Sequence, residues 1–291
     1  MVNKLKSRKF RILILGGRGF VGSAICSKLK DYPRTSVFTF DRHPKGKDKN
    51  HLQGDILSLP DLKKAMTGMD IVVNLIGLTP IRKPRHTTYK KVHIEGVKNV
   101  ISACKALKVK RLIRMSILGA DKKSSIEFFR TRGVGEELVS RSSIKTTVFC
   151  PSIIYDKENE LIRMLGKTAF TRMFPNIPAK IQPVYRQDIA KLYALAIQGI
   201  IKEKRIEVGG PNIMTIFQMA QKIYHKKGYS CIPLPLFLIK PVMKIFTWIN
   251  LFGMTNDQIK GFYINNITKS KVAEKYIQLT KFDKWLSRIS L

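Results

Sequence analysis

Acidic side chains are scarce in this sequence. Its 291 residues include 20 Asp and Glu against 54 Lys and Arg, which gives a formal net charge of +34 at pH 7. A charge of this size requires anionic surroundings, and nucleic acid, anionic lipid or an acidic protein can each supply them. The basic residues are spread along the chain rather than gathered in a tail or interleaved with an aromatic motif. This distribution argues against a dedicated nucleic-acid module, so no specific nucleic acid is expected as a partner.

Paired cysteines and clustered histidines are also missing. The four cysteines, Cys26, Cys104, Cys150 and Cys231, include no C-x-x-C pair and show no metal-ligand spacing. The first three fall within predicted apolar faces, which favours buried free thiols in a reducing compartment. None of the five histidines is followed by another four positions later. We therefore expect no metal site.

Long apolar runs are absent as well. No uncharged stretch approaches the roughly 18–20 residues that a membrane-spanning helix needs, so we expect a peripheral protein without a transmembrane helix. Residues 1–9 are basic but contain no apolar core of the kind found in a secretory signal. They are also short for an amphipathic transit peptide. If the protein belongs to an organelle, we expect its presequence to be already absent or unconventional.

The sequence does contain a glycine-rich turn between a predicted strand and a predicted helix. Residues 10–15 form a short apolar run that predicts a buried parallel strand. Glycines follow at positions 16, 19 and 22, and apolar residues then recur at helical spacing up to Leu29. In this context the missing Cβ atoms let the backbone approach a pyrophosphate, and the N–H groups at the helix start attract its charge. The alternative is a turn that only packs helix on strand, but the context favours a nucleotide site.

The second predicted strand, residues 36–40, is followed by two residues with opposing implications. Asp41 lies roughly twenty positions past the glycine turn, where a carboxylate accepts hydrogen bonds from an adenosine ribose 2′-hydroxyl. The adjacent Arg42, together with Arg18 in the turn, suits a 2′-phosphate instead. Asp41 can also simply open a turn before Pro44.

Strands and helices alternate through most of the chain. The further predicted strands lie at residues 51–55, 70–75, 111–116, 146–149 and 205–208. The longer predicted helices lie at residues 88–107, 125–140, 188–201, 215–227 and 256–265. This alternation predicts an α/β fold, a Rossmann-like doubly wound parallel sheet. We expect an NAD(P)-binding domain over residues 9–210 and a smaller, mainly helical C-terminal lobe over residues 211–291.

Residues 232–252 form the most informative stretch outside the nucleotide motifs. They are mostly Leu, Phe, Ile, Met and Trp, while Lys240, Lys244 and Thr247 fall on one narrow helical stripe. Such a segment suits a helix that lies in a bilayer interface or docks into an apolar groove. A buried C-terminal core helix explains the pattern equally well, so both interpretations stay open.

Several short motifs occur in the order found in one dehydrogenase superfamily. They are Gly16-x-x-Gly19-Phe20-Val21-Gly22, Asp70-Ile-Val-Val-Asn-Leu-Ile-Gly77, Arg114-Met-Ser116, Gly133-Val-Gly-Glu-Glu137, Pro151-Ser-Ile-Ile-Tyr155, Gln182-Pro-Val-Tyr-Arg-Gln-Asp188 and Val208-Gly-Gly-Pro211. By these motifs the chain resembles the extended, sugar-nucleotide-epimerase-like short-chain dehydrogenase/reductases. With residues 232–252 and Thr255-Asn-Asp-Gln258, it is most similar to the atypical branch that contains the nucleotide-binding accessory subunit of respiratory complex I. The resemblance covers nearly the whole chain.

The resemblance implies that the usual catalytic pair is lost. Active members carry Tyr-x-x-x-Lys after the fifth strand, where the tyrosine is the general acid/base and the lysine lowers its pKa and holds the nicotinamide ribose. Here Phe128 occupies the tyrosine position and Arg132 the lysine position, while Ser116, which orients the substrate in active members, is retained. Phenylalanine has no proton to exchange, so a contribution typically worth about 10²–10⁴-fold is missing. Three tyrosines on other elements are candidate substitutes: Tyr89, Tyr155 and Tyr185.

The resemblance also implies where a nucleotide would lie. Its adenosine end would meet the glycine turn and the end of the second strand, and its nicotinamide end would meet the fifth and sixth strands. The expected cofactor-binding residues are Gly16, Arg18, Gly19, Phe20, Val21, Gly22, Asp41, Arg42, Asp55, Leu75, Ile76, Gly77, Ser116, Arg132, Pro151 and Ile153. NADP(H) is favoured because relatives in this branch hold NADPH. NAD(H) stays open because a carboxylate at Asp41 would repel a 2′-phosphate.

The leading hypothesis from the resemblance is a non-catalytic NAD(P)(H)-binding accessory subunit or assembly factor of respiratory complex I, with the nucleotide as a structural cofactor. The expected partners are complex I subunits and an anionic membrane surface. The expected place is the matrix side of the mitochondrial inner membrane or the cytoplasmic face of a bacterial one. One alternative is an NAD(P)-dependent reductase or epimerase acting on a sugar nucleotide, isoprenoid or quinone-like substrate. Others are an accessory protein of ubiquinone biosynthesis and an RNA-associated protein built on a dehydrogenase fold.

Overall fold

A seven-stranded parallel sheet organises the chain. The computed structural model describes residues 9–43, 48–79, 87–235, 237, 260–261 and 263–290. The strands of the sheet are β1 (Phe10–Leu15), β2 (Thr35–Asp41), β3 (His51–Gln53), β4 (Ile71–Asn74), β5 (Arg111–Met115), β6 (Thr146–Pro151) and β11 (Arg205–Val208). They lie in the order β11-β6-β5-β4-β1-β2-β3, and every neighbouring pair is parallel. The predicted doubly wound parallel sheet is therefore confirmed.

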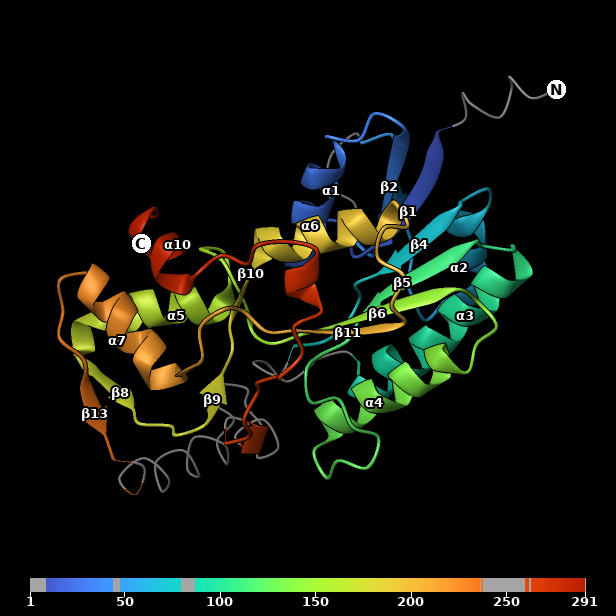
Figure 1. The fold of residues 1–291 in the computed structure, drawn as a ribbon. Coiled ribbons are helices and arrows are strands. Elements are labelled where there is room, and N and C mark those ends of the chain that lie inside the picture. The colour runs from blue at the N-terminus through green and yellow to red at the C-terminus, as the bar shows by residue number, and fades with distance from the viewer. Residues whose placement is uncertain are drawn as a thin grey trace.

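Helices cover both faces of this sheet, and a smaller lobe lies beside it (Figure 1). The α-helices are α1 (Phe20–Leu29), α2 (Leu59–Met66), α3 (Gly96–Ala106), α4 (Glu127–Ser140), α5 (Glu160–Thr168), α6 (Arg186–Ile197), α7 (Ile216–Lys226) and α10 (Phe282–Ser287). The short strands are β7 (Ile154–Tyr155), β8 (Met173–Pro175), β9 (Lys180–Ile181), β10 (Val184–Tyr185), β12 (Met214–Thr215) and β13 (Ile232–Leu234). They form three two-stranded pairs, β10 with β7, β12 with β9 and β13 with β8.

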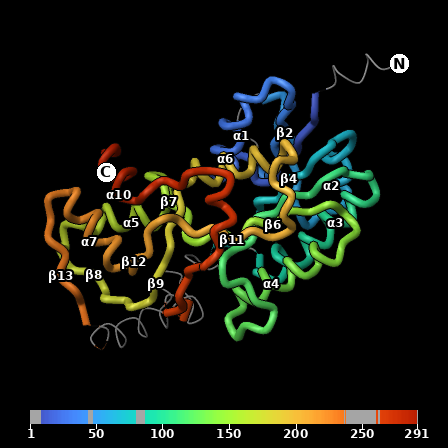
Figure 2. Tube along the Cα trace, in the orientation of Figure 1, coloured from blue at the N-terminus to red at the C-terminus, as the bar shows by residue number. Residues whose placement is uncertain are grey.

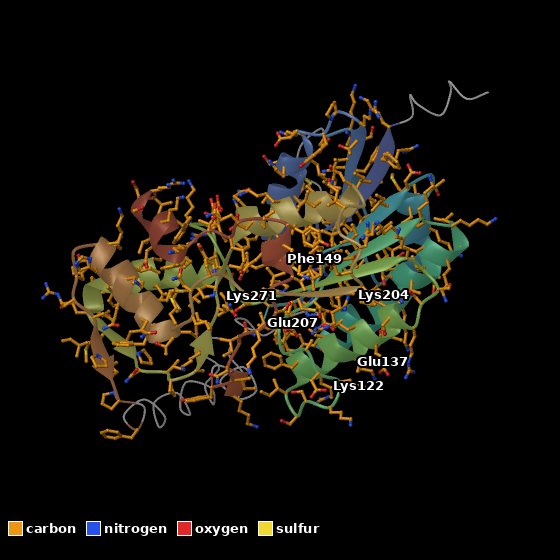
Figure 3. The ribbon with its side chains drawn as sticks, in the orientation of Figure 1. Lys122, Glu137, Phe149, Lys204, Glu207 and Lys271 are labelled. Carbon is orange, nitrogen blue, oxygen red and sulfur yellow. The ribbon has the colours of Figure 1, made fainter. Side chains whose placement is uncertain are left out.

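The apolar run in β1 is buried on both of its faces. Ile12 and Ile14 pack into the core under α1 and α6, whereas Leu13 and Leu15 pack into the core under α2 and α3. All four side chains are fully buried. Successive side chains of a strand point to opposite faces, so an unbroken apolar run fits a strand covered on both sides. On the neighbouring part of the sheet Phe149 is likewise buried inside the molecule (Figure 3).

The smaller lobe has a core of its own. That core joins residues of α5 and β8 to residues of α7 and α10. The ring of Tyr155 lies 4.9 Å from the ring of Phe282 and 4.9 Å from that of Trp285, both in α10. The smaller core therefore draws on residues before and after position 210, and the division of the chain at that position stays a prediction.

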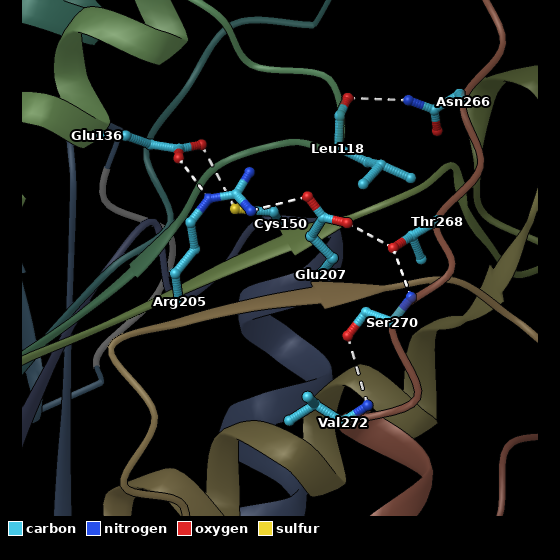
Figure 4. Close-up of polar contacts among 9 residues, drawn as sticks. All are labelled: Leu118, Glu136, Cys150, Arg205, Glu207, Asn266, Thr268, Ser270 and Val272. Carbon is cyan, nitrogen blue, oxygen red and sulfur yellow. Dashed lines mark hydrogen bonds and ion pairs between the residues drawn. The ribbon is translucent and has the colours of Figure 1, made fainter.

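The C-terminal segment ties the smaller lobe to the sheet. It pairs with β9 through Asn266, then passes β11 and leads into α10 (Figure 2). Asn266 Nδ2 donates to the carbonyl of Leu118 at 2.9 Å, and the Thr268 hydroxyl donates to the Glu207 carboxylate on β11 (Figure 4). Arg205, also on β11, binds Glu207 and reaches a glutamate of α4. These bonds hold the two parts together beside the carboxyl ends of the strands.

Several predicted elements differ from the structure at their ends. The helix predicted at residues 188–201 is α6, which begins at Arg186 and ends at Ile197, because Gly199 has a φ of +80° that a helix does not continue through. The first residues of the stretch 232–252 form β13, not a helix, since Pro233 and Pro235 favour extended backbone before them. Most of that stretch, and most of the helix predicted at residues 256–265, lie outside the described residues. Among the residues that are described, no helix is long and apolar enough to cross a bilayer.

The turn between β1 and α1 is held by direct backbone contact. Gly16 has a φ of +80°, and its N–H donates to the carbonyl of Phe40 on β2 at 2.8 Å. A Cβ atom at Gly22, in the first turn of α1, would overlap the Gly16 carbonyl oxygen and lie 2.7 Å from Gly17 Cα. The helix therefore rests on the turn itself, and a side chain at position 22 would push the two apart.

We expect Gly22→Ala to lower the free energy of unfolding by about 1–3 kcal/mol, because the added methyl group overpacks a rigid backbone contact. Gly166→Ala is the control, since Gly166 lies inside α5 and a Cβ there meets nothing within 4 Å. That change should raise the free energy of unfolding by about 0.4–1 kcal/mol. Urea denaturation of both variants measures the two values. A Gly22→Ala protein as stable as the parent would contradict the contact.

Candidate nucleotide-binding site

The carboxyl ends of the strands meet beside the glycine turn. β1 pairs with β2 on one side and with β4 on the other, so the strand order reverses between β1 and β4. Open α/β sheets bind ligands in the crevice at such a reversal. Here Gly19 precedes α1 as its N-cap and provides no side-chain hydrogen bond, and Phe20, Val21 and Gly22 form the first turn of the helix. Backbone N–H groups at such a helix start suit a pyrophosphate.

Arg18 and Asp41 form a two-point ion pair at the expected adenosine end. Arg18 Nε and Nη2 donate to the two oxygens of Asp41 at 2.8 and 2.6 Å. Burial alone would raise the pKa of Asp41, but hydrogen bonds from Arg18 and from the N–H of His43 hold that pKa below its ordinary value. Both oxygens of Asp41 are engaged and its charge is balanced. Arg42, the next residue, is exposed.

Asp55 lies half-buried just after β3. Its Oδ1 accepts a hydrogen bond from the N–H of Leu57 at 2.9 Å, and its own N–H donates to Asp61 Oδ2 at 3.0 Å. The turn that enters α2 therefore fixes the direction of this carboxylate. The adenine contact that the resemblance implies for Asp55 stays a prediction.

Leu75, Ile76 and Gly77 continue from the end of β4, beside the reversal of strand order. The N–H of Ile76 donates to Asn74 Oδ1 at 3.1 Å, which turns the chain away from the strand. A Cβ atom at Gly77 would overlap the guanidinium of Arg132. The glycine therefore lets the side chain from α4 lie directly over the end of β4.

Ser116 and Arg132 lie together at the ends of β4 and β5. Arg132 Nη1 and Nη2 donate to the carbonyls of Met115 and Leu78, both at 3.3 Å. Burial and the charge of Arg114 lower the pKa of Arg132 to about 9. Ser116 Oγ and Arg132 Nε are buried and have no hydrogen-bond partner among the described residues. Buried polar atoms are almost always paired, so these two atoms fit a polar ligand at this place.

Phe128 is packed in an aromatic cluster. Its ring makes edge-on contacts with Tyr89 at 5.5 Å, His93 at 6.0 Å and Phe129 at 5.5 Å between ring centroids. The guanidinium carbon of Arg132 lies 5.8 Å from the centroid of the Phe128 ring. The position of the general acid/base in active relatives thus holds an apolar ring under a buried cation.

The structure separates the three tyrosines that the sequence offered as substitutes. Tyr89 lies against Phe128, and its hydroxyl donates to the carbonyl of Thr79 at 3.2 Å. Tyr155 is buried in the smaller lobe and donates to the carbonyl of Thr280 at 3.0 Å. Tyr185 stacks on Tyr155, and burial raises the pKa of both hydroxyls. Tyr89 is the one of the three that the fold brings to the Phe128 position.

His93 belongs to this cluster although sequence reasoning assigned it no role. Its Nε2 accepts from the N–H of Leu78 at 3.1 Å, and its Nδ1 lies 3.0 Å from the Thr131 hydroxyl, which itself donates to the carbonyl of Glu127. These bonds assign the proton to Nδ1. Burial and the charges of Arg132 and Arg114 push the pKa of His93 far below its ordinary value, so the ring is neutral.

The turn at Pro151 and Ile153 closes the far side of the expected nicotinamide end. The N–H of Leu118 donates to the Pro151 carbonyl at 2.9 Å, and the N–H of Val184 donates to that of Ile153 at 2.9 Å. Between them the Ser152 hydroxyl is bonded to Asn266 at 2.6 Å. The turn is therefore fixed by the chain after β5, by β10 and by the C-terminal segment.

The donor set fits a nicotinamide dinucleotide. A cradle without Cβ atoms lies at the helix start, and buried polar atoms without partners lie at the opposite end of the crevice. Across the described ranges, no three His, Cys, Asp or Glu side chains gather as metal ligands. Arg114 belongs neither to the glycine motif nor to the catalytic pair. The feature of the sequence that could have drawn attention to it is a charged residue inside an otherwise apolar strand.

Comparisons with known proteins agree with this geometry. A model of the 3-beta hydroxysteroid dehydrogenase/isomerase family matches residues 13–126. The chain is 24% identical to the NADH-ubiquinone oxidoreductase 40 kDa subunit of Neurospora crassa, over 79% of this chain and 64% of that protein. It is also 24% identical to NADH dehydrogenase [ubiquinone] 1 alpha subcomplex subunit 9 of Arabidopsis thaliana, over 72% of this chain and 56% of that protein. It thus spans less than two thirds of either relative.

Solved structures show the same fold. A nucleoside-diphosphate-sugar epimerase from Staphylococcus aureus superposes with a TM-score of 0.73 at 18% identity, over 96% of this chain and 100% of that one. At that identity the likeness concerns the fold alone. The family model and the two relatives support an atypical short-chain dehydrogenase/reductase of the extended type that resembles the accessory subunit of respiratory complex I.

Proposed function

We propose that this chain is a non-catalytic NAD(P)(H)-binding accessory subunit or assembly factor of respiratory complex I, and that the nucleotide is a structural cofactor. One observation carries the proposal. The glycine turn and the polar nicotinamide end are kept, whereas the acid/base position holds Phe128 inside an aromatic cluster. The names of the Neurospora and Arabidopsis relatives support complex I as the partner.

The residues around Phe128 argue against the superfamily's usual proton transfer. When bound, a nicotinamide supplies hydride chemistry, which needs a proton donor beside the substrate carbonyl. Phe128 has no such proton, and the neutral His93 uses both ring nitrogens in bonds to Leu78 and Thr131. Arg132 stays protonated at neutral pH and acts as a hydrogen-bond donor. The residues at the usual catalytic position therefore favour holding a nucleotide over the superfamily's usual proton transfer.

The expected nucleotide site supports a structural role for the nucleotide. It extends from the glycine turn on β1 to Arg132 over β4 and β5, so one ligand would join the two halves of the sheet. A ligand that binds the folded state alone stabilises it by mass action, about 2.7 kcal/mol at a concentration 100 times Kd. Bound nucleotide would therefore add stability without any turnover.

NADP(H) is the favoured cofactor because Asp41 is balanced by Arg18. With both carboxylate oxygens engaged, Asp41 offers little to a ribose 2′-hydroxyl and repels a 2′-phosphate less than a free carboxylate would. The exposed Arg42 beside it adds a further cation. NAD(H) is the alternative if the Arg18–Asp41 pair opens when nucleotide binds.

An anionic membrane surface is the second proposed partner. The net charge of +34 favours such a surface. At the far edge of the smaller lobe Met173 on β8 pairs with Ile232 on β13, and both are exposed, as are Phe170 and Phe237. We place the protein peripherally at the matrix side of the mitochondrial inner membrane, or at the cytoplasmic face of a bacterial one.

A second candidate function is an NAD(P)-dependent reductase in which Tyr89 replaces the lost acid. The contact between Tyr89 and Phe128 favours it, because the fold brings a hydroxyl-bearing ring against the residue that stands at the tyrosine position. The family model that matches residues 13–126 describes dehydrogenases and isomerases.

Purification of the tagged full chain from its own membranes in mild detergent tests the partner. We expect subunits of NADH:ubiquinone oxidoreductase to co-purify in near-stoichiometric amounts and to be identified by mass spectrometry. A chain that stays in the soluble fraction and is recovered alone would overturn the accessory-subunit proposal.

NADPH oxidation by the purified protein separates the two candidate functions. With quinone, sugar-nucleotide and 3-oxo substrates we expect no steady NADPH oxidation above background. We also expect the Tyr89→Phe variant to show the same rate as the parent. Tyr185→Phe is the matched control, since that ring lies in the smaller lobe. Turnover that falls by about 10²-fold or more in Tyr89→Phe, but not in the control, would establish the reductase.

Arg18→Gln tests the basis of the nucleotide preference. Loss of the guanidinium frees Asp41 to accept a ribose 2′-hydroxyl and to repel a 2′-phosphate, so the preference for NADPH over NADH should fall by about tenfold. Titration calorimetry gives both dissociation constants. Lys28→Gln removes one charge from α1, where Lys28 pairs with Asp31, and should leave the ratio unchanged. An unchanged ratio in Arg18→Gln would reject the role given to the ion pair.

A further inference from the structure

Arg186 lies where the start of α1 meets the smaller lobe. It is the first residue of α6, the helix that packs along α1 (Figure 1). Its side chain is 13% exposed. A guanidinium that is largely removed from water needs polar partners around it. These partners come from two parts of the chain that lie far apart in the sequence.

On one side the guanidinium holds Phe20, the first residue of α1. Arg186 Nη1 donates to the Phe20 carbonyl at 3.3 Å, and the guanidinium carbon lies 4.9 Å from the centroid of the Phe20 ring. A cation over the face of an aromatic ring is attracted to it. The same group therefore holds the main chain and the side chain of Phe20. Because Phe20 directly follows Gly19, this contact steadies the first turn of α1 and the direction of its N–H groups.

On the other side the guanidinium meets two carboxylates of the segment after β7. Arg186 Nε lies 3.0 Å from Asp156 Oδ2, and Nη1 lies 2.6 Å from Glu158 Oε2. The contact with Asp156 is an ion pair without the geometry of a directed hydrogen bond. The Glu158 side chain is half exposed, whereas Asp156 is 6% exposed. Water therefore screens the pair with Glu158 more than the pair with Asp156.

Asp156 connects Arg186 to the core of the smaller lobe. Its Oδ1 accepts hydrogen bonds from the N–H of Lys157 at 2.8 Å and from Trp285 Nε1 at 3.4 Å. Trp285 lies on α10, is 3% exposed and belongs to the core of that lobe. One residue thus separates Arg186 from this core, while Arg186 itself contacts α1.

The start of α6 is anchored independently of the Arg186 side chain. Asp188, in the first turn of α6, is fully buried, and its Oδ2 accepts a hydrogen bond from the N–H of Thr280 at 2.6 Å. Its Oδ1 lies 3.1 Å from Lys191 Nζ. The helix therefore has its own attachment to the C-terminal segment. A substitution at position 186 tests the contacts of the side chain and not the placement of the helix.

We propose that Arg186 is a positioning residue, which sets the first turn of α1 for the pyrophosphate of a dinucleotide and makes that binding depend on the smaller lobe. The inference rests on the nucleotide-binding function proposed above and names how that site is connected to the rest of the chain. Arg186 acts through Phe20. Coupling of this kind is reciprocal, so a ligand at the glycine turn steadies the smaller lobe to the same degree as the lobe favours the ligand.

The charges around Arg186 set the size of the effect. The first turn of α1 contains no acidic residue, and its N–H groups attract an anion. Asp156 and Glu158 oppose that attraction, and Arg186 lies against both of them. Loss of Arg186 leaves two carboxylates without this cation beside the turn. A change of one unit charge several ångströms from an anion, at an effective dielectric constant near 20, weakens binding by about tenfold or more.

The test uses ADP-ribose and 2′-phospho-ADP-ribose, which carry the pyrophosphate but no nicotinamide and do not absorb tryptophan emission. The chain has two tryptophans, so a Trp248→Phe background leaves Trp285 as the single reporter. Titration calorimetry on the full chain gives the dissociation constants, and fluorescence gives the response of Trp285. In this background we expect at least one of the two ligands to bind and to shift the Trp285 emission.

Arg186→Gln should weaken the binding by about tenfold and remove the shift of the Trp285 emission. Arg186→Lys keeps the charge but not the planar fork of donors, so it should lose a smaller part of both. Arg163→Gln is the matched control, because Arg163 is exposed on α5 and its loss removes the same charge from the smaller lobe. Its affinity and its Trp285 response should equal those of the parent.

The outcomes separate this inference from the function on which it rests. If neither ligand binds the parent, the nucleotide-binding function itself is wrong. If the parent binds and both Arg186 variants bind as tightly, the positioning role is wrong and the binding function stands. Binding that leaves the Trp285 emission of the parent unchanged would overturn the coupling to the smaller lobe, and an equal loss in Arg163→Gln would assign the effect to net charge. Thermal unfolding without ligand shows which variants are folded, and Arg186→Lys decides alone if Arg186→Gln is not.

Discussion

The burial of β1 on both faces is the constraint on which this molecule depends. Its four apolar residues, Ile12 to Leu15, belong alternately to the two cores that flank the sheet. A strand in this position must pair on both edges, and its partners β2 and β4 place the reversal of strand order directly beside the glycine turn. The crevice is therefore a consequence of the way the core is built. A nucleotide site at this point needs no further architecture, only side chains along its rim.

Those rim residues show which functions were kept. The adenosine end has a carboxylate, but Arg18 balances it, and the nicotinamide end has a buried cation where active relatives have a lysine. Between them Phe128 joins an aromatic cluster with Tyr89, His93 and Phe129. Arg18 and Arg132 are cations that suit an anionic dinucleotide. Phe128, in contrast, lacks the hydroxyl proton that the tyrosine of active relatives provides. This pattern supports the proposed non-catalytic binding function.

The second lobe takes part in this arrangement through the C-terminal segment. Asn266 bonds the Leu118 carbonyl after β5 and the Ser152 hydroxyl after β6, so one residue fixes two of the turns that border the nicotinamide end. Thr268 and Glu207 extend the link to the edge strand β11. A nucleotide that rigidifies these turns would also steady the smaller lobe, which carries the exposed apolar edge at Met173 and Ile232.

The sequence by itself determined the parallel sheet, the glycine turn and the loss of the tyrosine, because strand burial, backbone freedom and side-chain chemistry are local properties. The ends of helices were harder to predict from the sequence. At Ile197, for example, a single glycine beyond the helix decides where the last turn ends. Only the tertiary structure decided which charges meet: Arg18 with Asp41 across two strands, and Arg114 with Arg132 across a strand and a helix. It also brought Tyr89 and His93 to Phe128, and residues before position 210 into the smaller core. Such contacts depend on how whole elements pack, and no spacing along the chain records the distance between side chains that lie far apart in it.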